Sequence, residues 1–348
     1  MDRRTFKLNQ FLTKNGWGDA KQAPLKGDAS NRRYIRLSQQ GKTVMVMDAP
    51  PPGENVSPFI HIAEFLKGHQ LSAPEIIARD TDNGFLILED FGDDTYSRML
   101  KSEPNCEYEL YKLALDVLIH LHSLPNDNAL PENIELYNTE RLLQEALLLV
   151  DWYIPAVTGK PVKQTMRDDY EMIWRDVFKP LSGNETCIVL RDYHVDNLMQ
   201  AGNRTGMSAC GLLDFQDALA GHPAYDVMSL LEDARRTVDA DLKQQMMTYY
   251  CQAFPALKTG TEARKKFDYA FAALGAGRHA KVIGIFTRLC VRDNKPVYID
   301  HIPRVWGLLE TSLLHDELRP LKKWFDEHVP TCDRGLPPLL KAMKVAND

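Results

Sequence analysis

The hydrophobic pattern close to the N-terminus is helical. Four apolar residues recur at a spacing that brings side chains to one face of a helix: Phe6, Leu8, Phe11 and Leu12. An Asn-Gly pair at residues 15–16 follows as a stop signal. This segment therefore predicts an amphipathic helix that buries the four apolar side chains.

Beyond this helix the pattern becomes extended. Polar and apolar residues alternate over residues 34–38, a Gln-Gln-Gly turn follows, and a second run covers residues 43–47. Alternation on both sides of a short turn predicts a β-hairpin. A helix is predicted over residues 58–68, and further strands over 74–78 and 84–88. We expect these strands to belong to a small, five-stranded antiparallel sheet.

From residue 94 onward the pattern is mainly helical. Apolar residues lie on both sides of the segment 108–122, so we expect a largely buried helix there. Further helices are predicted over residues 141–150, 162–181, 224–238, 240–254, 261–289 and 303–326. A sheet followed by a run of helices indicates the α+β class, with a small antiparallel sheet and a mostly helical remainder.

One stretch near the middle of the chain combines short strands with polar side chains. The apolar run 187–190 leads to Asp192, and Asn197 follows five residues later. Another apolar run, 208–213, ends at Asp214. Two short strands that each end near a carboxylate can place the carboxylates side by side. The stretch therefore predicts a compact polar site.

The chemistry of phosphoryl transfer needs these residue types. A carboxylate orients and deprotonates the attacking hydroxyl, and oxygen ligands hold Mg²⁺ against the phosphates of ATP. Asp192 suits the first role, and Asn197 and Asp214 suit the second. The spacing Asp-x-x-x-x-Asn, followed by apolar-apolar-Asp-aromatic, is typical of kinases. Here Phe215 is the aromatic residue, but Gln216 replaces the Gly of protein kinases, which argues against an ordinary protein kinase.

Three linked motifs resemble the aminoglycoside phosphotransferase and choline kinase superfamily. Its H-G-D-x-H-x-x-N corresponds to residues 190–197, with Leu190 in place of the first His. Its I-D-[FW]-[EQ]-x-A corresponds to residues 213–218, and its G-x-P-x-x-D-[LV] to residues 221–227. Within the superfamily, the sequence is most similar to the bacterial kinases that phosphorylate N-acetylmuramate and N-acetylglucosamine on the anomeric C1 hydroxyl.

This resemblance implies a protein-kinase-like fold and specific roles. ATP and Mg²⁺ are the expected cofactors. Asp192 is expected to act as the catalytic base, and His194 is a second catalytic candidate that braces the loop. Asn197 and Asp214 are the expected metal ligands, and Asp226 is expected to anchor loop amides from the start of a helix.

The resemblance also implies two lobes. Residues 1–91 form the expected N-lobe, which covers the nucleotide, and residues 92–348 form the helical C-lobe with the catalytic loop, metal and acceptor sites. Small residues ahead of the hairpin allow backbone amides to approach a phosphate. Backbone groups near residue 90, where kinases pass between lobes, would bind adenine. The expected nucleotide contacts are Ser30, Asn31, Arg33, Glu89 and Phe91.

The second hairpin strand departs from the kinase pattern. In kinases it carries a cation that pairs with the α- and β-phosphates. When the sequence is aligned on Pro50, this position is Met47. The candidate replacements are Arg32, Arg33 and Lys42. The alternative is a pseudokinase that binds a nucleotide without turnover.

The acceptor implied by the resemblance is an amino sugar phosphorylated in peptidoglycan recycling. The lactyl carboxylate of N-acetylmuramate favours an arginine fork, and arginines recur along the C-terminal helices. The candidate acceptor contacts are Asp217, Arg235 and Arg288. Aminoglycoside, choline and homoserine are alternative acceptors; choline would need an aromatic cage, and an aminoglycoside would need an acidic cleft.

Composition narrows the class of partner. A net charge of -6 argues against nucleic acid as a partner. The six cysteines form no C-x-x-C motif and lie mostly in apolar runs, so we expect reduced, buried thiols and a cytoplasmic protein. No segment has the length and apolarity of a membrane span or of a secretion signal. We expect a monomer that binds a small molecule.

Overall fold

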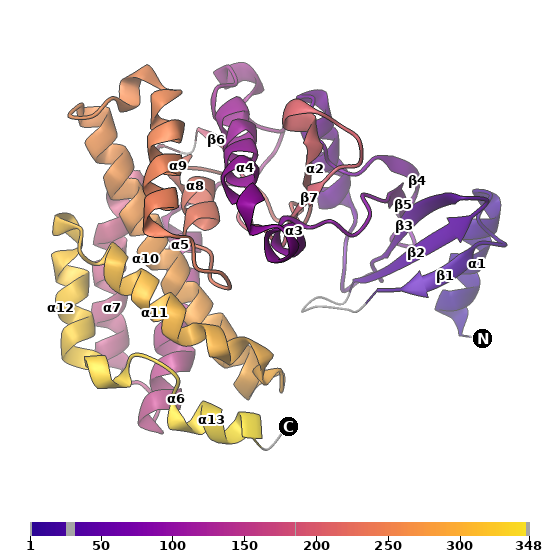
Figure 1. Ribbon diagram of the computed structural model, residues 1–348. Coiled ribbons are helices and arrows are strands. Elements are labelled where there is room, and N and C mark those ends of the chain that lie inside the picture. Colours follow the sequence, from indigo (N-terminus) through magenta and orange to yellow (C-terminus); the bar gives the residue numbers. More distant parts are fainter. Residues whose placement is uncertain (1, 26–31, 185, 346–348) are drawn as a thin grey trace. The chain divides into compact units, whose positions relative to one another are not determined.

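Two compact units make up the computed structural model (Figure 1). The structure describes residues 2–25, 32–184 and 186–345. The first unit comprises Met1–Val117 and Asp192–Ala218, and the second comprises Leu118–Arg191 and Leu219–Asp348. The lobe boundary expected after residue 91 lies inside the first unit and stays a prediction.

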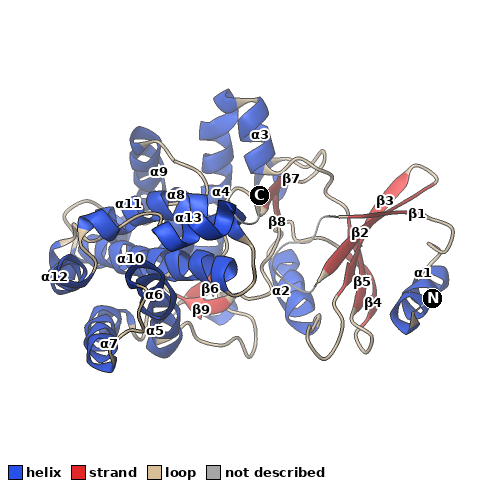
Figure 2. Cartoon of the chain, turned by 90° about the horizontal axis from the view of Figure 1, so that it is seen from below, coloured by secondary structure: helices blue, strands red, loops and turns tan. Residues whose placement is uncertain are grey.

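A five-stranded antiparallel sheet dominates the first unit, as expected (Figure 2). Its strands lie in the order β1-β2-β3-β5-β4. Their bounds are β1 (Lys21–Pro24), β2 (Arg33–Gln39), β3 (Lys42–Asp48), β4 (Ile76–Asp80) and β5 (Phe85–Glu89). Strands β2 and β3 form the predicted hairpin, with Gln39 opposite Lys42 at its turn.

Helix α1 (Arg3–Lys14) covers one face of this sheet. The buried residues of this core are Leu8, Phe11 and Leu12 of the helix, Ala20, and Leu37, Val44, Val46, Phe85 and Ile87 of the sheet. The prediction that Phe6 is buried with them is wrong, because its side chain is 53% exposed. At 100° per residue, Phe6 lies about 160° around the helix axis from Leu8, which places it opposite the apolar face.

The opposite face of the sheet is on the side of α2 (Ser57–Gly68) (Figure 2). The first unit also contains α3 (Tyr96–Ser102) and the first part of α4 (Glu107–His122). A short hairpin of β7 (Leu198–Gln200) and β8 (Cys210–Leu212) completes it. Because Leu198 pairs with Leu212, the residues just before β7 and just after β8 are neighbours.

The second unit is mainly helical. Its central element is the long helix α10 (Glu262–Val291), which packs against α5, α8 and α11. The other elements are α5 (Thr139–Leu148), α6 (Ile154–Thr158), α7 (Gln164–Phe178), α8 (Ala224–Leu231), α9 (Ala240–Gln252), α11 (Ile302–Ser312), α12 (Arg319–His328), α13 (Pro338–Val345) and the antiparallel pair β6 (Cys187–Val189) and β9 (Leu219–Gly221).

Two helix predictions were wrong in this unit. The single helix expected over residues 303–326 is divided into α11 and α12, and Pro320 lies in the first turn of α12, where its missing N–H costs no helical hydrogen bond. Helix α8 ends at Leu231 rather than at residue 238. Beyond it, the Asp233 carboxylate accepts a hydrogen bond from the backbone N–H of Arg235, a local turn that competes with the helix.

Two further expectations concern cysteines and membrane spans. All six cysteines are free thiols, of which Cys187, Cys210, Cys251 and Cys290 are buried, whereas Cys332 is exposed. No helix among residues 2–25, 32–184 and 186–345 combines the length and the apolar composition that a membrane span requires.

Candidate active site

Asp226, at the start of α8, holds the backbone that precedes Asp192. Its buried carboxylate accepts hydrogen bonds from the backbone N–H groups of Leu190 at 2.6 Å and Arg191 at 2.9 Å. The hydroxyl of Ser229 donates to the carbonyl oxygen of Arg191 at 3.2 Å. Arg191 has a φ of 69°, in the left-handed region. Asp226 therefore makes the loop contacts expected of an anchor.

The loop from Asp192 to Asn197 is packed into the first unit. The Tyr193 hydroxyl donates to the carbonyl oxygen of Ala114 at 2.8 Å, and the Val195 carbonyl accepts from the Ser97 N–H at 3.0 Å. His194 is buried, and its carbonyl oxygen accepts from the backbone N–H of Asn197 at 2.9 Å. His194 thus contributes to the internal hydrogen bonding of the loop, and its catalytic role stays a prediction.

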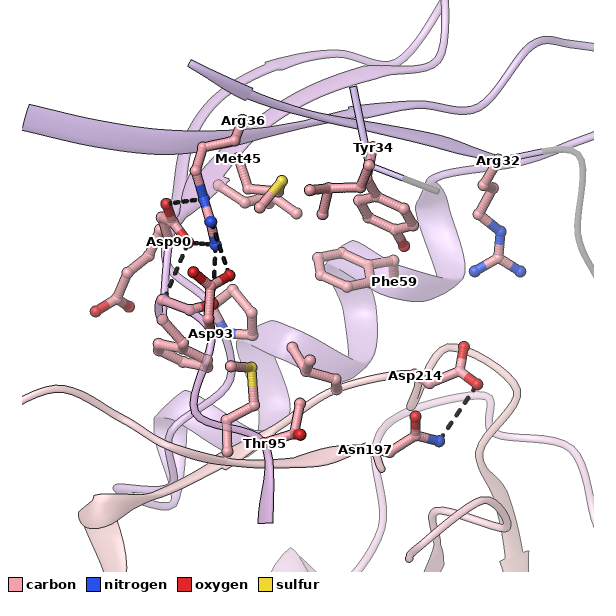
Figure 3. A pocket seen from close by; sticks show the side chains of 18 of the residues that line it. Arg32, Tyr34, Arg36, Met45, Phe59, Asp90, Asp93, Thr95, Asn197 and Asp214 are labelled. Carbon is pink, nitrogen blue, oxygen red and sulfur yellow. Dashed lines mark hydrogen bonds and ion pairs between the residues drawn. The ribbon is translucent and has the colours of Figure 1, made fainter. Parts of the chain in front are cut away.

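Asn197 contacts both the candidate base, Asp192, and the other candidate metal ligand, Asp214, and Figure 3 shows the second of these contacts. Its amide nitrogen donates to the backbone carbonyl of Asp192 at 2.9 Å and lies 3.5 Å from Oδ2 of Asp214. The β7–β8 pairing brings these residues together, since the Leu213 N–H donates to the Asn197 carbonyl at 3.0 Å. Gln216 donates to Oδ1 of Asp214 at 2.9 Å. The structure therefore brings together three residues that the sequence separates.

This donor set fits Mg²⁺. The amide nitrogen of Asn197 donates to the Asp192 carbonyl and also faces Oδ2 of Asp214, so its amide oxygen is the atom that would bind a cation. Over the described ranges 2–25, 32–184 and 186–345, no group of three or more His, Cys, Asp or Glu side chains is placed to hold a metal. Mg²⁺ commonly takes one or two protein ligands and completes its shell with water and substrate phosphates.

A cavity of about 550 Å³ within the first unit is lined in part by Asn197 and Asp214. Its apolar lining includes Met45 and Phe59, which lie in the middle of the view in Figure 3. Arg32, Asn197 and Asp214 lie together at one end, which is polar. The other end is formed by Arg36 and the segment 89–93. An apolar slot with a polar end that contains the two predicted metal ligands suits a flat base joined to phosphates.

The sequence-predicted nucleotide residues fall into three groups. Glu89 and Phe91 line the cavity. Ser30 and Asn31 lie outside the described residues. Arg33 does not line the cavity, because side chains alternate along β2 and Arg33 is on the α1 face, where it pairs with Asp48 at 2.6 Å.

Sequence reasoning missed Arg36, which braces the segment 89–93. Its guanidinium donates to Asp90 at 3.0 Å, to Asp93 at 2.8 Å and to the carbonyl of Gly92 at 2.9 Å. The hydrogen bonds that Arg36 donates to Asp90 and Asp93 raise the pKa of Arg36 despite partial burial. Alternation along β2 was the available signal, since it places Tyr34 and Arg36 on one face. The two aspartates carried no signal, because aspartates after a strand are ordinary turn residues.

A second arginine contacts the same segment. Arg204, in the β7–β8 loop, donates to Glu89 at 2.5 Å and to the Ser72 hydroxyl at 2.9 Å. Its guanidinium carbon lies 5.4 Å from the centre of the Phe91 ring. Both sequence-predicted residues of the segment are therefore held by Arg204.

The predicted acceptor residues are distributed over both units. Asp217 lines the cavity of the first unit. Arg235 and Arg288 belong to the second unit. The guanidinium of Arg235 lies 6.0 Å from the Tyr298 ring, and burial together with the nearby charge of Arg292 lowers the pKa of Arg288. The acceptor roles of these residues stay predictions.

Comparisons with known proteins identify the family. The profile of the phosphotransferase enzyme family matches residues 21–261, which include the sheet, the loop from Asp192 to Asn197, and Asp214. The chain belongs to the phosphotransferase enzyme family. This phosphotransferase is 34% identical to an N-acetylmuramate/N-acetylglucosamine kinase of Caulobacter vibrioides, over 92% of the chain and 95% of the relative. It is also 34% identical to a Pseudomonas aeruginosa kinase of the same name, over 88% of each chain.

Solved structures confirm the kinase-like fold of this phosphotransferase. The choline kinase LicA from Streptococcus pneumoniae superposes with a TM-score of 0.61 at 11% identity, over 89% of this chain and all of the other. At such low identity the likeness concerns the fold alone. The predicted family and fold class are thus confirmed.

Proposed function

We propose that this phosphotransferase transfers the γ-phosphoryl group of ATP to the anomeric C1 hydroxyl of N-acetylmuramate or N-acetylglucosamine. The observation that carries the proposal is the convergence of Asn197 on the Asp192 carbonyl and on Asp214 at the polar end of the cavity. The acceptor class rests on the names of the relatives, which match over most of the chain.

The nucleotide would place its base in the apolar middle of the cavity and its phosphates at the end with Asn197 and Asp214. Mg²⁺, held by these two residues, would neutralise charge on the phosphates. The backbone at Asp192 is held in a fixed position by hydrogen bonds on both sides. Its own carbonyl accepts from Asn197, and the backbone amides of the two preceding residues donate to Asp226. Such preorganisation supports catalysis by positioning.

In the proposed reaction Asp192 accepts the proton of the sugar hydroxyl. The hydroxyl oxygen forms a bond to the γ-phosphorus, and the bond from that phosphorus to the β–γ bridging oxygen breaks, so that ADP leaves with the electron pair. No bond to C1 of the sugar breaks. The product is therefore a sugar 1-phosphate that retains the configuration of the starting anomer, and the α anomer gives the α-1-phosphate.

The acceptor contacts are part of the proposal. The carboxylate of N-acetylmuramate would favour a guanidinium, for which Arg235 and Arg288 are the candidates, and Asp217 could accept from a sugar hydroxyl. N-acetylglucosamine lacks this carboxylate. If Arg235 or Arg288 binds this carboxylate, its substitution should raise KM more for N-acetylmuramate than for N-acetylglucosamine.

A nucleotide-binding protein without turnover is the second candidate. The observation in its favour is Met47, an apolar residue at the strand position where kinases carry a cation. The retained set of Asp192, Asn197 and Asp214 favours turnover instead.

The test is an assay of ADP release with Mg-ATP and a panel of acceptors. The panel contains N-acetylmuramate, N-acetylglucosamine, an aminoglycoside, choline and homoserine. We expect release only with the two amino sugars, and a phosphorus NMR signal of an anomeric phosphate. Turnover of another acceptor would replace the proposed substrate, and ATP binding without turnover of any acceptor would support the second candidate.

A further inference from the structure

Met47 leaves the cavity face of β3 without a cation. The residue is 1% exposed, and it pairs with Tyr34 on β2 and Leu86 on β5. A nucleotide phosphate chain in a partly dry cavity needs a positive group in addition to Mg²⁺. The cation must therefore come from another element.

Arg32, immediately before β2, lies at the polar end of the cavity. It shares strand parity with Tyr34 and Arg36, and all three line the cavity. In Figure 3 its guanidinium is on the side of the cavity that contains Asp214 and Asn197. The side chain is 14% exposed, so its charge acts where water screens it only in part.

Glu54 orients this guanidinium. Its carboxylate accepts from Nε of Arg32 at 2.9 Å, and the Glu54 side chain is also only 14% exposed. Burial opposes the charge of Arg32, but the bond to Glu54 and the charges of Glu54 and Asp217 outweigh it, so the pKa of Arg32 is raised. A contact at Nε engages one edge of the guanidinium, whereas both Nη groups carry further donors.

The other cations named from the sequence are placed less favourably. Arg33 is 63% exposed and pairs with Asp48 on the α1 face. Lys42 is exposed at the turn of the hairpin. Arg36 lines the cavity, but it is bonded to Asp90 and Asp93, which offset its charge. Among these candidates, Arg32 is therefore the best placed to replace the cation that Met47 lacks.

We propose that Arg32 binds the phosphates of the nucleotide and that Glu54 positions it, in place of the strand cation whose position Met47 occupies. The inference rests on the proposed function. It assigns binding to Arg32, which would touch the phosphates, and a positioning role to Glu54, which would act through Arg32.

The chain offers a matched control pair. Arg79 on β4 and Glu64 on α2 also form an ion pair, at 3.1 Å, but their side chains are 58% and 62% exposed and neither lines the cavity. Exposed pairs of this kind contribute little to stability. Arg79→Met therefore removes a guanidinium from the same sheet without changing the cavity.

The experiment measures the affinity of the full-length protein for adenosine, AMP, ADP and ATP by calorimetry, with Mg²⁺ present. Arg32→Met should weaken the binding of ADP and ATP by about ten- to a hundredfold, because hydrogen bonds between charged groups are stronger than those between neutral groups. The affinity for adenosine, which has no phosphate, should be unchanged. Glu54→Gln should show a smaller loss with the same dependence on phosphate, which a purely structural role would not produce. Arg79→Met should match the wild type.

Two safeguards separate the possible outcomes. The double variant Arg32→Met with Glu54→Gln leaves no unpaired carboxylate, so its ADP affinity tests the phosphate contact even if Arg32→Met is unstable. The inference is overturned if wild-type protein binds ADP and the Arg32 variants bind it equally well. It is also overturned if these variants lose affinity for adenosine as much as for ADP. If wild-type protein binds no nucleotide, the proposed function itself fails.

Discussion

The side-chain amide of Asn197 donates a hydrogen bond to the backbone carbonyl of Asp192 over 2.9 Å. A candidate metal ligand therefore also fixes the backbone of the candidate base. Asn197→Ala should remove both effects, with a fall in kcat of at least about a hundredfold and a higher Mg²⁺ concentration for half-maximal turnover. A titration of turnover with Mg²⁺ measures both quantities.

Asn203→Ala is the matched control for this substitution. Asn203 is an exposed asparagine in the loop between β7 and β8. It should leave kcat and the Mg²⁺ requirement unchanged. An unaltered Mg²⁺ requirement in Asn197→Ala would show that Asn197 is not a ligand.

The carboxylate of Asp192 should matter for turnover and little for nucleotide binding. Asp192→Asn keeps the size of the side chain and the backbone carbonyl that Asn197 bonds. Because only the proton acceptor is lost, we expect kcat to fall by about a hundredfold or more, with ADP affinity nearly intact. Turnover assays and calorimetry on the same preparation measure the two effects, and an equal loss of both would refute this separation of roles.

Arg36 should influence nucleotide affinity through the segment 89–93. Arg36→Met removes hydrogen bonds to Asp90, Asp93 and Gly92, so the segment loses its fixed position beside the cavity. We expect KM for ATP to rise about five- to tenfold, with kcat nearly unchanged. Steady-state kinetics separate the two constants.

A control and a stability measurement accompany this prediction. Lys21→Met removes an exposed cation from the neighbouring strand β1 and should change neither constant. Thermal unfolding checks that Arg36→Met is folded at the assay temperature, since Asp90 is left with a largely buried carboxylate. A fall in kcat at constant KM would contradict a role in nucleotide positioning.

Two partly buried histidines of the second unit, His122 and His222, should make stability depend on pH. Burial lowers the pKa of His122 to about 3 and that of His222 to about 4. The unfolded chain takes up these protons below about pH 6.5 and the folded chain does not, so unfolding becomes easier as the pH falls from about 6.5 toward 4. Each group contributes up to about 1.4 kcal/mol per pH unit.

His222→Asn isolates one of these contributions. The Nδ1 atom of His222 accepts from the backbone N–H of Ala224 at 3.1 Å, and an asparagine oxygen can replace that acceptor. Urea unfolding at pH 7.5, 6 and 5 should give a shallower loss of stability in the variant than in the wild type. Parallel pH profiles would show that His222 is protonated equally in both states.

The sequence was sufficient for features that depend on local spacing. Asp192 and Asn197 lie five residues apart on one loop, and two short strands with an intervening turn bring Asp214 beside them, so the polar cluster followed from motif order. The hairpin and most helices followed from periodicity for the same reason. The family was recognisable from these motifs, and the profile match confirmed it.

Features that depend on which side of an element faces the cavity were harder to predict. Arg33 was predicted to contact the nucleotide and Arg36 was not considered, whereas their opposite parity on β2 directs Arg33 to the α1 face and Arg36 to the cavity. Phe6 was assigned to a core from which its helical angle excludes it. Pairings between distant residues, such as Arg36 with Asp90 or Arg204 with Glu89, have no signature in a single sequence.

One face of β2 packs in the core and the other borders the cavity, so the two faces can be redesigned separately. Odd-numbered positions such as Ile35 and Leu37 pack toward α1, whereas even-numbered positions such as Tyr34 and Arg36 border the cavity. Substitutions at the even positions would therefore change which nucleotide the cavity binds and leave the core packing intact. Substitutions at the odd positions would change thermal stability and leave nucleotide specificity intact.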